Sequence, residues 1–211
     1  MLSTTSNRVA TWNAFGALAQ YVLSIEALPI SEYRLSMWYS RKGDTAEAQA
    51  RFDQGDAVLD MFVASLGEED AYMAPKVYRL RAEALDRIVT PESGKEENAS
   101  VRAAYDMART VAASMRPDAD AIAASELVWI DYRYLLTLRP SEAKSEALEK
   151  ELVAEFLTHN KEYYAINMYL KRLGTDKSLP QAASREKKDV IAIASRSPEF
   201  KTFLTNLGWK I

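Results

Sequence analysis

The chain has 211 residues, of which 48% are hydrophobic and 27% charged, and its formal net charge is −3. This length and composition are typical of a globular chain that buries a core of its own. The small acidic excess argues against a general nucleic-acid or anionic-membrane binder, because those surfaces reward a concentrated basic excess. The absence of cysteine excludes disulfides, thiolate catalysis and cysteine metal sites.

The N-terminal region, residues 8–28, predicts an amphipathic helix. Its apolar stripe recurs at spacings of three and four residues and consists of Phe15, Leu18, Val22 and Ile25. The triplet A-L-A at 17–19 looks like a signal-peptide cleavage site, so secretion is the alternative to the cytoplasmic location that we expect. No stretch reaches the ~18 apolar residues of a membrane span, and we expect no membrane partner.

The rest of the chain has helical periodicity almost everywhere, and no strand pattern competes with it. The seven glycines and seven prolines stand mostly where one apolar stripe ends and the next begins. After the first helix we expect helices near residues 31–42, 45–66, 73–89, 99–115, 119–138, 141–158, 161–173, 180–195 and 198–208. The last has the clearest start, because Ser197 can cap it, Pro198 suits its first turn and Glu199 meets the positive end of the helix dipole.

Short helices joined by short turns pack as antiparallel neighbours, so the pattern predicts a row of helical hairpins. In the hairpin over residues 31–60, Gly43 predicts a turn and Asp44 or Thr45 a helix cap. Small residues let two helices approach, and aromatic residues fill the gaps beside them. Small and large residues alternate across this hairpin: Leu35, Ser36, Tyr39, Ala48, Phe52 and Gly55.

This stretch resembles a tetratricopeptide repeat. That motif has a leucine, a small residue and an aromatic on its first helix, then alanine, an aromatic and another small residue on its second, and about 30 residues match well. The resemblance implies an all-α fold of antiparallel hairpins stacked as a tetratricopeptide-like α-solenoid of about nine or ten helices. We expect a single such domain over residues 1–211, in which residues 197–211 form the C-terminal capping helix.

A second resemblance concerns the order of the segments 76–88, 103–117 and 125–143, which is similar to the C-terminal half of 14-3-3 proteins. Those proteins hold phosphoserine with a lysine, two arginines and a tyrosine, and grip the peptide backbone with an asparagine. Here Ile88 follows Arg87 where the tyrosine would stand. A phosphate would therefore lack several of its charge-assisted donors, and phosphopeptide reading is kept as an alternative.

Two single residues are candidates for chemistry. His159 is the only histidine, so the sequence does not support a histidine metal cluster, and we interpret His159 as a loop or helix-end residue. The sequence has no phosphate-binding glycine loop or dinucleotide fingerprint, and we expect no metal ion and no cofactor. Asp131 lies within an apolar run and needs a partner, for which we expect an ion pair with Arg79 or Arg87. The alternative, from a different class of function, is a helical enzyme that uses Asp131 as its acid, with Glu126 and Arg87 beside it.

Three helices place arginine, aromatic and methionine side chains at helical spacing on the face that would line a groove. Arginine and aromatic residues anchor interfaces, and methionine adapts to varied partners. The alternative is that the apolar members are core residues and the arginines ordinary surface charges. The predicted groove consists of Tyr33, Met37 and Arg41, then Arg79, Glu83 and Arg87, and finally Glu126, Trp129 and Arg133.

These patterns predict a non-enzymatic scaffold or adaptor that binds a peptide or protein partner in a concave groove. A rigid curved surface loses little conformational entropy when it binds. We expect no nucleic-acid partner and no catalytic residue. A structural subunit of a larger assembly is the alternative, and the repeat ends and the first helix are candidate contact surfaces for a second copy.

Overall fold

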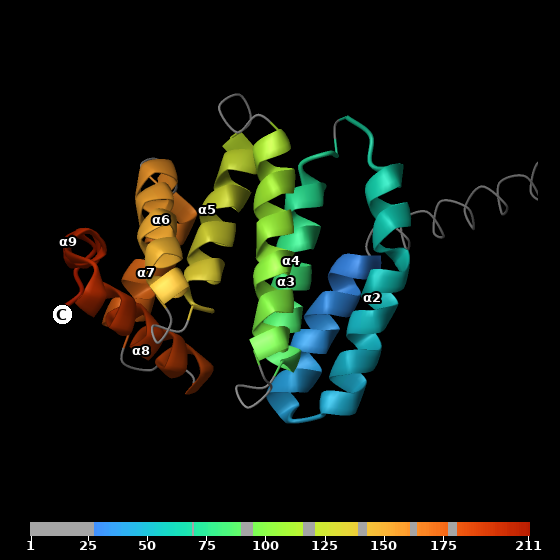
Figure 1. Ribbon diagram of the computed structural model, residues 1–211, viewed down its shortest axis with the longest axis horizontal. Helices are drawn as coiled ribbons and strands as arrows, with labels where there is room; N and C mark the ends of the chain where they lie inside the picture. Colours follow the sequence, from blue (N-terminus) through green and yellow to red (C-terminus); the bar gives the residue numbers. More distant parts are fainter. Residues whose placement is uncertain are drawn as a thin grey trace, which may run out of the picture. The chain divides into compact units, whose positions relative to one another are not determined.

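The computed structural model describes residues 28–68, 70–89, 95–115, 121–138, 143–160, 164–176 and 181–211. Within these ranges the chain consists of α-helices and their connections, without a strand (Figure 1). The all-α prediction is thereby confirmed. The helix expected over residues 8–28 lies outside the described residues, apart from residue 28.

The helices agree closely with those expected from periodicity. Residues 28–42 form the first described helix. It is followed by α2 (Thr45–Ser65), α3 (Met73–Ile88), α4 (Lys95–Ser114), α5 (Ala121–Leu135), α6 (Ala143–His159), α7 (Tyr164–Thr175), α8 (Gln181–Arg196) and α9 (Pro198–Asn206). The largest difference is at α4, which begins four residues earlier than predicted. The sequence there is Lys95-Glu96-Glu97, and both residue types are strong helix formers.

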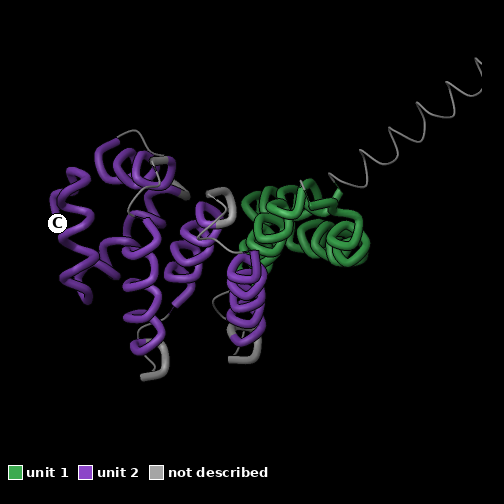
Figure 2. The backbone as a smooth tube through the Cα atoms, turned by 90° about the horizontal axis from the view of Figure 1, so that it is seen from above, with its two compact units in different colours: residues 1–97 green, residues 98–211 purple. Residues whose placement is uncertain are grey.

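The chain divides into two compact units, residues 1–97 (unit 1) and residues 98–211 (unit 2), coloured separately in Figure 2. The boundary falls within the first turn of α4. Whether the two units join into the single domain expected from the sequence stays a prediction. No helix among the described residues is long and apolar enough to cross a membrane.

Unit 1 contains the hairpin predicted around Gly43. Gly43 has a φ of 81°, a left-handed conformation that glycine adopts without steric cost. Asp44 caps α2, because its Oδ1 accepts a hydrogen bond from the backbone N–H of Glu47 at 3.1 Å. A cap of this kind stabilises a helix by about 1 kcal/mol. The turn and the cap are therefore where the sequence placed them.

Small residues let the two helices of this hairpin approach closely. The buried Ser36 donates its Oγ–H to the backbone carbonyl of Ala48, at 2.7 Å. Two turns further along α2, a Cβ atom built on Gly55 would lie only 2.7 Å from Cε1 of Tyr33. The ring of Tyr33 thus packs directly on the backbone of α2, and any side chain at position 55 would require the ring to shift.

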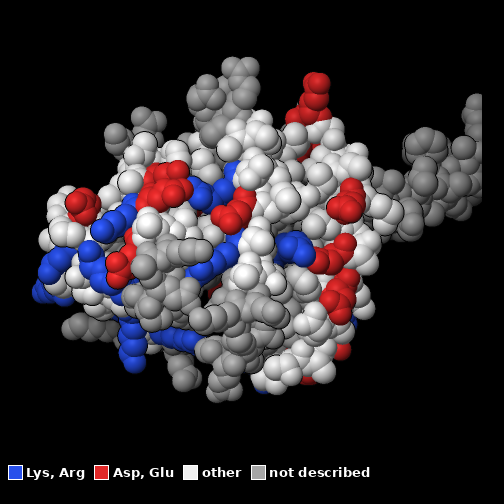
Figure 3. Space-filling model, viewed as in Figure 1, with Lys and Arg blue, Asp and Glu red and all other residues white. Residues whose placement is uncertain are grey.

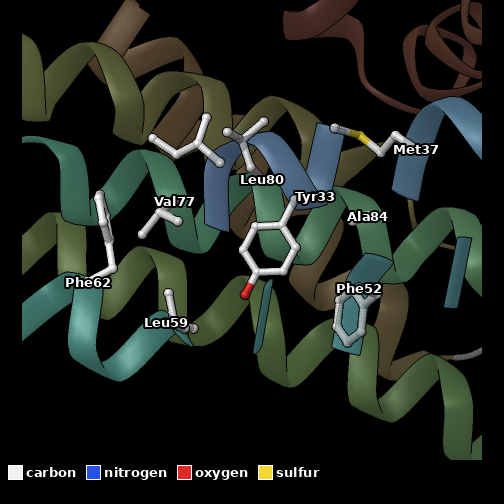
Figure 4. Packing of buried hydrophobic residues seen from close by; sticks show 9 residues of the cluster. Tyr33, Met37, Phe52, Leu59, Phe62, Val77, Leu80 and Ala84 are labelled. Atoms are coloured by element: carbon white, nitrogen blue, oxygen red, sulfur yellow. The ribbon is translucent and has the colours of Figure 1, made fainter. Parts of the chain in front are cut away.

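The core of unit 1 joins helix 28–42, α2 and α3 (Figure 4). Its buried members are Ile30, Tyr33, Met37, Phe52, Leu59, Phe62, Val77, Leu80 and Ala84. A polar group at the edge connects the same three helices. Asp56 of α2 accepts hydrogen bonds from the hydroxyl of Tyr33 at 2.7 Å and from Arg81 of α3 at 2.9 and 2.7 Å.

Unit 2 is built from α4 to α9, and aromatic residues fill much of its interior. Tyr105 of α4 stacks on Tyr134 of α5 with ring centroids 5.1 Å apart. Phe156 of α6 makes an edge contact with Phe200 of α9 at 5.8 Å. The buried Trp209 donates its Nε1–H to the backbone carbonyl of Leu170 at 2.9 Å. The C-terminal residues are thereby part of the packed unit.

The start of α9 is as predicted. Ser197 accepts a hydrogen bond from the N–H of Phe200 at 3.2 Å, with proline in the first turn and Glu199 beside it. Phe200 and Leu204 are fully buried, so the apolar face of α9 lies against the rest of unit 2.

Candidate functional site

Two of the predicted groove residues in unit 1 lie in its core. Tyr33 is fully buried and Met37 is buried beside it, because Val77, Leu80 and Ala84 of α3 pack in the same cluster (Figure 4). These two side chains offer no surface to a partner. The expectation that they line an exposed groove is therefore corrected.

The other predicted residues of unit 1 are charged and lie nearer the surface. Arg41 is exposed near the end of helix 28–42. On α3, Arg79 and Glu83 form an ion pair one helical turn apart, with only 13% and 11% of their side chains exposed. Arg87, one turn further, is half-buried, and its backbone carbonyl accepts a hydrogen bond from Ser40 Oγ at 2.8 Å. Arg79 and Glu83 are thus engaged with each other.

The remaining predicted residues lie on α5 in unit 2. Glu126, Trp129 and Arg133 are all half-buried. Arg133 lies over Trp129, with its Cζ 5.7 Å from the ring centroid. The structure therefore brings Trp129 and Arg133 together, as their spacing predicted.

Around this pair the structure assembles a group that we call the aromatic–arginine cluster. It consists of Trp129, Tyr132 and Arg133 of α5, Tyr169 of α7 and Glu186 of α8. The Cζ atom of Arg133 is 5.4 Å from the ring centroid of Tyr132 and 5.7 Å from that of Tyr169. Cation–π contacts with a partly desolvated guanidinium are worth about 1 to 2 kcal/mol each.

Glu186 anchors the aromatic–arginine cluster. Its Oε1 lies 3.1 Å from Nη1 of Arg133 and accepts hydrogen bonds from the hydroxyls of Tyr132 at 2.6 Å and Tyr169 at 2.7 Å. Burial raises the pKa of Glu186, but the charge of Arg133 and the two tyrosine hydroxyls outweigh it and lower the pKa below its ordinary value. Glu186 is therefore a carboxylate at neutral pH and fixes the orientation of the guanidinium.

The two tyrosines are neutral hydrogen-bond donors. Burial raises the pKa of Tyr169 to about 12, and burial also raises the pKa of Tyr132 well above its ordinary value. About 18% of the Arg133 side chain remains exposed. The result is a pre-organised surface in which an oriented arginine is held among three aromatic rings.

Asp131 is fully buried on α5, and its partners differ from those expected. Its Oδ1 lies 3.3 Å from Nε of Arg109 on α4, and its Oδ2 lies 3.3 Å from Nδ1 of His159 at the end of α6. The prediction of Arg79 or Arg87 as partner is wrong, because α4 and α6 supply the neighbours of this part of α5. Arg109 also forms ion pairs with Glu155 and Glu151 of α6.

The buried carboxylate of Asp131 is faced by one arginine and one histidine. Burial raises the pKa of Asp131, and the neighbouring His159 and Arg109 oppose that rise. The hydrogen bond to Asp131 raises the pKa of His159, although partial burial acts against it. Glu126, the second acid of the enzyme alternative, is about 140° around the helix from Asp131. Among the described residues, no group of acidic and histidine side chains could hold a metal ion.

One face of the molecule carries charges of both signs. On the face shown in Figure 3, acidic side chains gather over α2, whereas basic and acidic side chains lie beside each other over unit 2.

The chain shows no significant similarity to known proteins in sequence or in fold. No protein-family model matches the sequence, no curated protein matches it significantly, and no solved structure is significantly similar to the fold.

Proposed function

We propose that this chain is a non-enzymatic adaptor with tetratricopeptide-like helical hairpins, and that unit 2 binds a peptide or protein partner through the aromatic–arginine cluster. The observation that carries this proposal is the guanidinium of Arg133, held by Glu186 and three rings while about 18% of the side chain stays exposed. Arginine and tryptophan are the residue types most enriched at binding hot spots.

The hairpin over residues 28–65 supports the proposal of tetratricopeptide-like helical hairpins. The contacts of Ser36 with Ala48 and of Gly55 with Tyr33 are close approaches at the small positions of the tetratricopeptide motif. Hairpins with such packing stack into curved arrays. A stack of this kind would present its helices as a rigid surface.

The chemistry of the aromatic–arginine cluster favours an acidic, partly apolar peptide. The positive charge of Arg133, whose side chain is about 18% exposed, would attract a carboxylate of the partner, and an apolar side chain would pack on the half-buried Trp129. Because Glu186 already orients the guanidinium, the entropy cost of ordering it on binding is small. Phosphopeptide reading is a second candidate for the same arginine, but a phosphate favours several converging cations.

A set of single variants tests this proposal against a library of acidic peptides, with affinity measured by fluorescence anisotropy. We expect Arg133→Lys, which keeps the charge but loses the planar donors, to weaken the best binder at least tenfold. Trp129→Leu should do the same.

The matched control is Arg172→Ala on α7, an arginine whose side chain is 80% exposed and whose loss should leave affinity unchanged. The melting temperature of every variant checks that the fold is kept. If Arg133→Lys and Arg172→Ala reduce affinity equally, or if no acidic peptide binds the wild type, the aromatic–arginine cluster is not a recognition site.

A further inference from the structure

Helix 28–42 presents large apolar side chains on the side that faces away from the core of unit 1. Trp38 has 49% of its surface exposed and Leu35 has 38%. The ring of Trp38 is oriented by its neighbours, because the ring centroid of Tyr39 lies 4.8 Å away and Nζ of Lys42 lies 5.5 Å from the Trp38 centroid. A tryptophan that is exposed and oriented is suited to anchor a contact with another protein surface.

Two arginines follow one edge of this apolar side. Arg34 and Arg41 are exposed, and their separation of seven positions corresponds to about two helical turns, or about 10 Å. Viewed from the start of the helix, they lie about 40° and about 60° counterclockwise of Trp38. We call this side of the helix the basic face; it consists of Ser31, Arg34, Leu35, Trp38 and Arg41.

The side of α2 that faces away from the core of unit 1 carries smaller residues. Ala57 and Ala64 are exposed, and Met61 has 59% of its surface exposed. Ala57 lies about 160° around the helix from the buried Leu59, so this side points away from the core. Its alanines leave room for a large side chain of another surface.

Two aspartates follow one edge of this side of α2, in the region where Figure 3 shows acidic side chains. Asp53 and Asp60 are exposed and are also seven positions apart. Asp53 accepts a hydrogen bond from Nε2 of Gln49 at 2.8 Å. Viewed from the start of α2, the aspartates lie about 40° and about 60° counterclockwise of Ala57. We call this side the acidic face; it consists of Asp53, Ala57, Asp60, Met61 and Ala64.

The basic face and the acidic face match when the two helices run antiparallel. On both helices the charged edge lies counterclockwise of the centre of the face, so an antiparallel pair brings the two edges to the same side. A parallel pair would place them on opposite sides. An antiparallel pairing of either face with itself would bring like charges together, which is unfavourable. Charge therefore favours contact between the basic face and the acidic face.

We propose that the basic face of one chain binds the acidic face of a second copy of this chain. The tryptophan ring fills the space above an alanine, and the equal spacing of the charges lets both arginines meet an aspartate at once. The register consists of the pairs Trp38 with Ala57, Leu35 with Met61, Arg34 with Asp60 and Arg41 with Asp53.

This contact joins two different faces, so it is heterologous. Both faces point away from the core of unit 1, and each chain therefore offers one face to each of two neighbours. A heterologous contact builds a ring when the rotation between neighbours closes and a filament when it does not. The proposal concerns unit 1 and is independent of the recognition surface proposed for unit 2.

Two variants of the full chain, each blocked on one face, test the proposal by sedimentation velocity. Trp38→Glu places an acid opposite the acidic face, and Ala57→Arg places a long basic side chain opposite the basic face. We expect the wild type to associate with rising concentration between about 1 μM and about 1 mM, the range of weak to moderate protein affinities. Each variant alone should stay monomeric. Their equimolar mixture should form a dimer and grow no further, because each variant keeps one intact face.

The matched controls are Met107→Glu and Ala113→Arg, the same kinds of change at exposed positions of α4, which should associate like the wild type. Circular dichroism checks that every variant is folded. A monomeric wild type over the whole range, or a mixture that stays monomeric, would overturn the proposal. Association of Ala57→Arg alone would also overturn it and would assign the basic face to itself.

An exchange of charges tests the register. Arg34→Glu and Asp60→Arg each place like charges opposite one another, and each alone should weaken self-association about fivefold. Their equimolar mixture restores opposite charges at every contact, so its affinity should return to within about twofold of the wild type. A mixture as weak as the separate variants would show that the two residues do not face each other and would overturn the proposed register.

Discussion

Gly55 shows how one residue sets the distance between two helices. The Tyr33 ring packs against the α2 backbone at this position, and its hydroxyl is held by Asp56 at 2.7 Å. Because both ends of the tyrosine are fixed, the ring has little freedom to move away from an added methyl group. In an exposed helix, alanine would be preferred to glycine by about 1 kcal/mol, but here the steric term opposes that gain.

We predict that Gly55→Ala lowers the free energy of unfolding by about 1 to 2 kcal/mol, since overpacking of a core costs about 1 to 3 kcal/mol. The measurement is urea denaturation followed by circular dichroism. The matched control is Gly67→Ala, because no atom lies within 4 Å of a Cβ built at Gly67. A Gly55→Ala variant as stable as the wild type would show that Tyr33 can shift.

At the scale of elements, α9 is a short helix whose start is fixed by a side chain. Its cap is the hydroxyl of Ser197, which accepts the hydrogen bond from Phe200 N–H at 3.2 Å. The fully buried Phe200 and Leu204 depend on this start being correct. In a helix of nine residues, the loss of one cap affects a large fraction of the element.

We predict that Ser197→Ala reduces the free energy of unfolding by about 1 kcal/mol. Ser197→Asp should keep most of the wild-type stability, because aspartate is an equally good cap. Ser195→Ala is the control, since the hydroxyl of the exposed Ser195 bonds, within the described part of the chain, only to the carbonyl of Ala192 in its own helix. Urea midpoints compare the three variants. Equal midpoints for Ser197→Ala and Ser195→Ala would contradict a capping role.

At the scale of the whole molecule, we expect the buried Asp131 and its partner His159 to make stability depend on pH. It is faced by Arg109 of α4 and His159 of α6, with Glu151 and Glu155 of α6 beside that arginine. The pKa of His159 is raised in the folded chain. Its contribution to stability is therefore fully present below the ordinary histidine pKa of about 6.5, and it is lost as the pH rises through the higher folded value.

We predict that the urea midpoint of the wild type falls between pH 6 and pH 9, and that His159→Asn removes most of this fall. The raised pKa of Asp131 also makes stability fall with rising pH, but over a lower pH range. The reason is that the folded chain must ionise a buried acid once the pH exceeds the ordinary aspartate pKa of about 3.9. Midpoints at pH 5, 6, 7, 8 and 9 for both proteins provide the check. Parallel pH profiles would mean that the pair of Asp131 with His159 contributes nothing to folding.

Much of the secondary structure followed from the sequence, because helix periodicity, turns and caps are local properties. Gly43 and Asp44 marked the hairpin of unit 1, and Ser197 marked the start of α9, where the structure has them. Trp129 and Arg133 were found together for the same reason, since residues four apart share a helix face. The tetratricopeptide resemblance and the binding function remain predictions.

Only the tertiary structure decided which apolar faces are covered and which charges meet. Periodicity showed that Tyr33 and Met37 share a face, but the packing of α3 in the same core made that face buried. Glu186 meets Tyr132 across 54 positions of sequence, and Asp131 meets His159 across 28. Such pairings depend on how helices pack against each other. Many different packings satisfy the same local patterns, so no local pattern encodes these contacts.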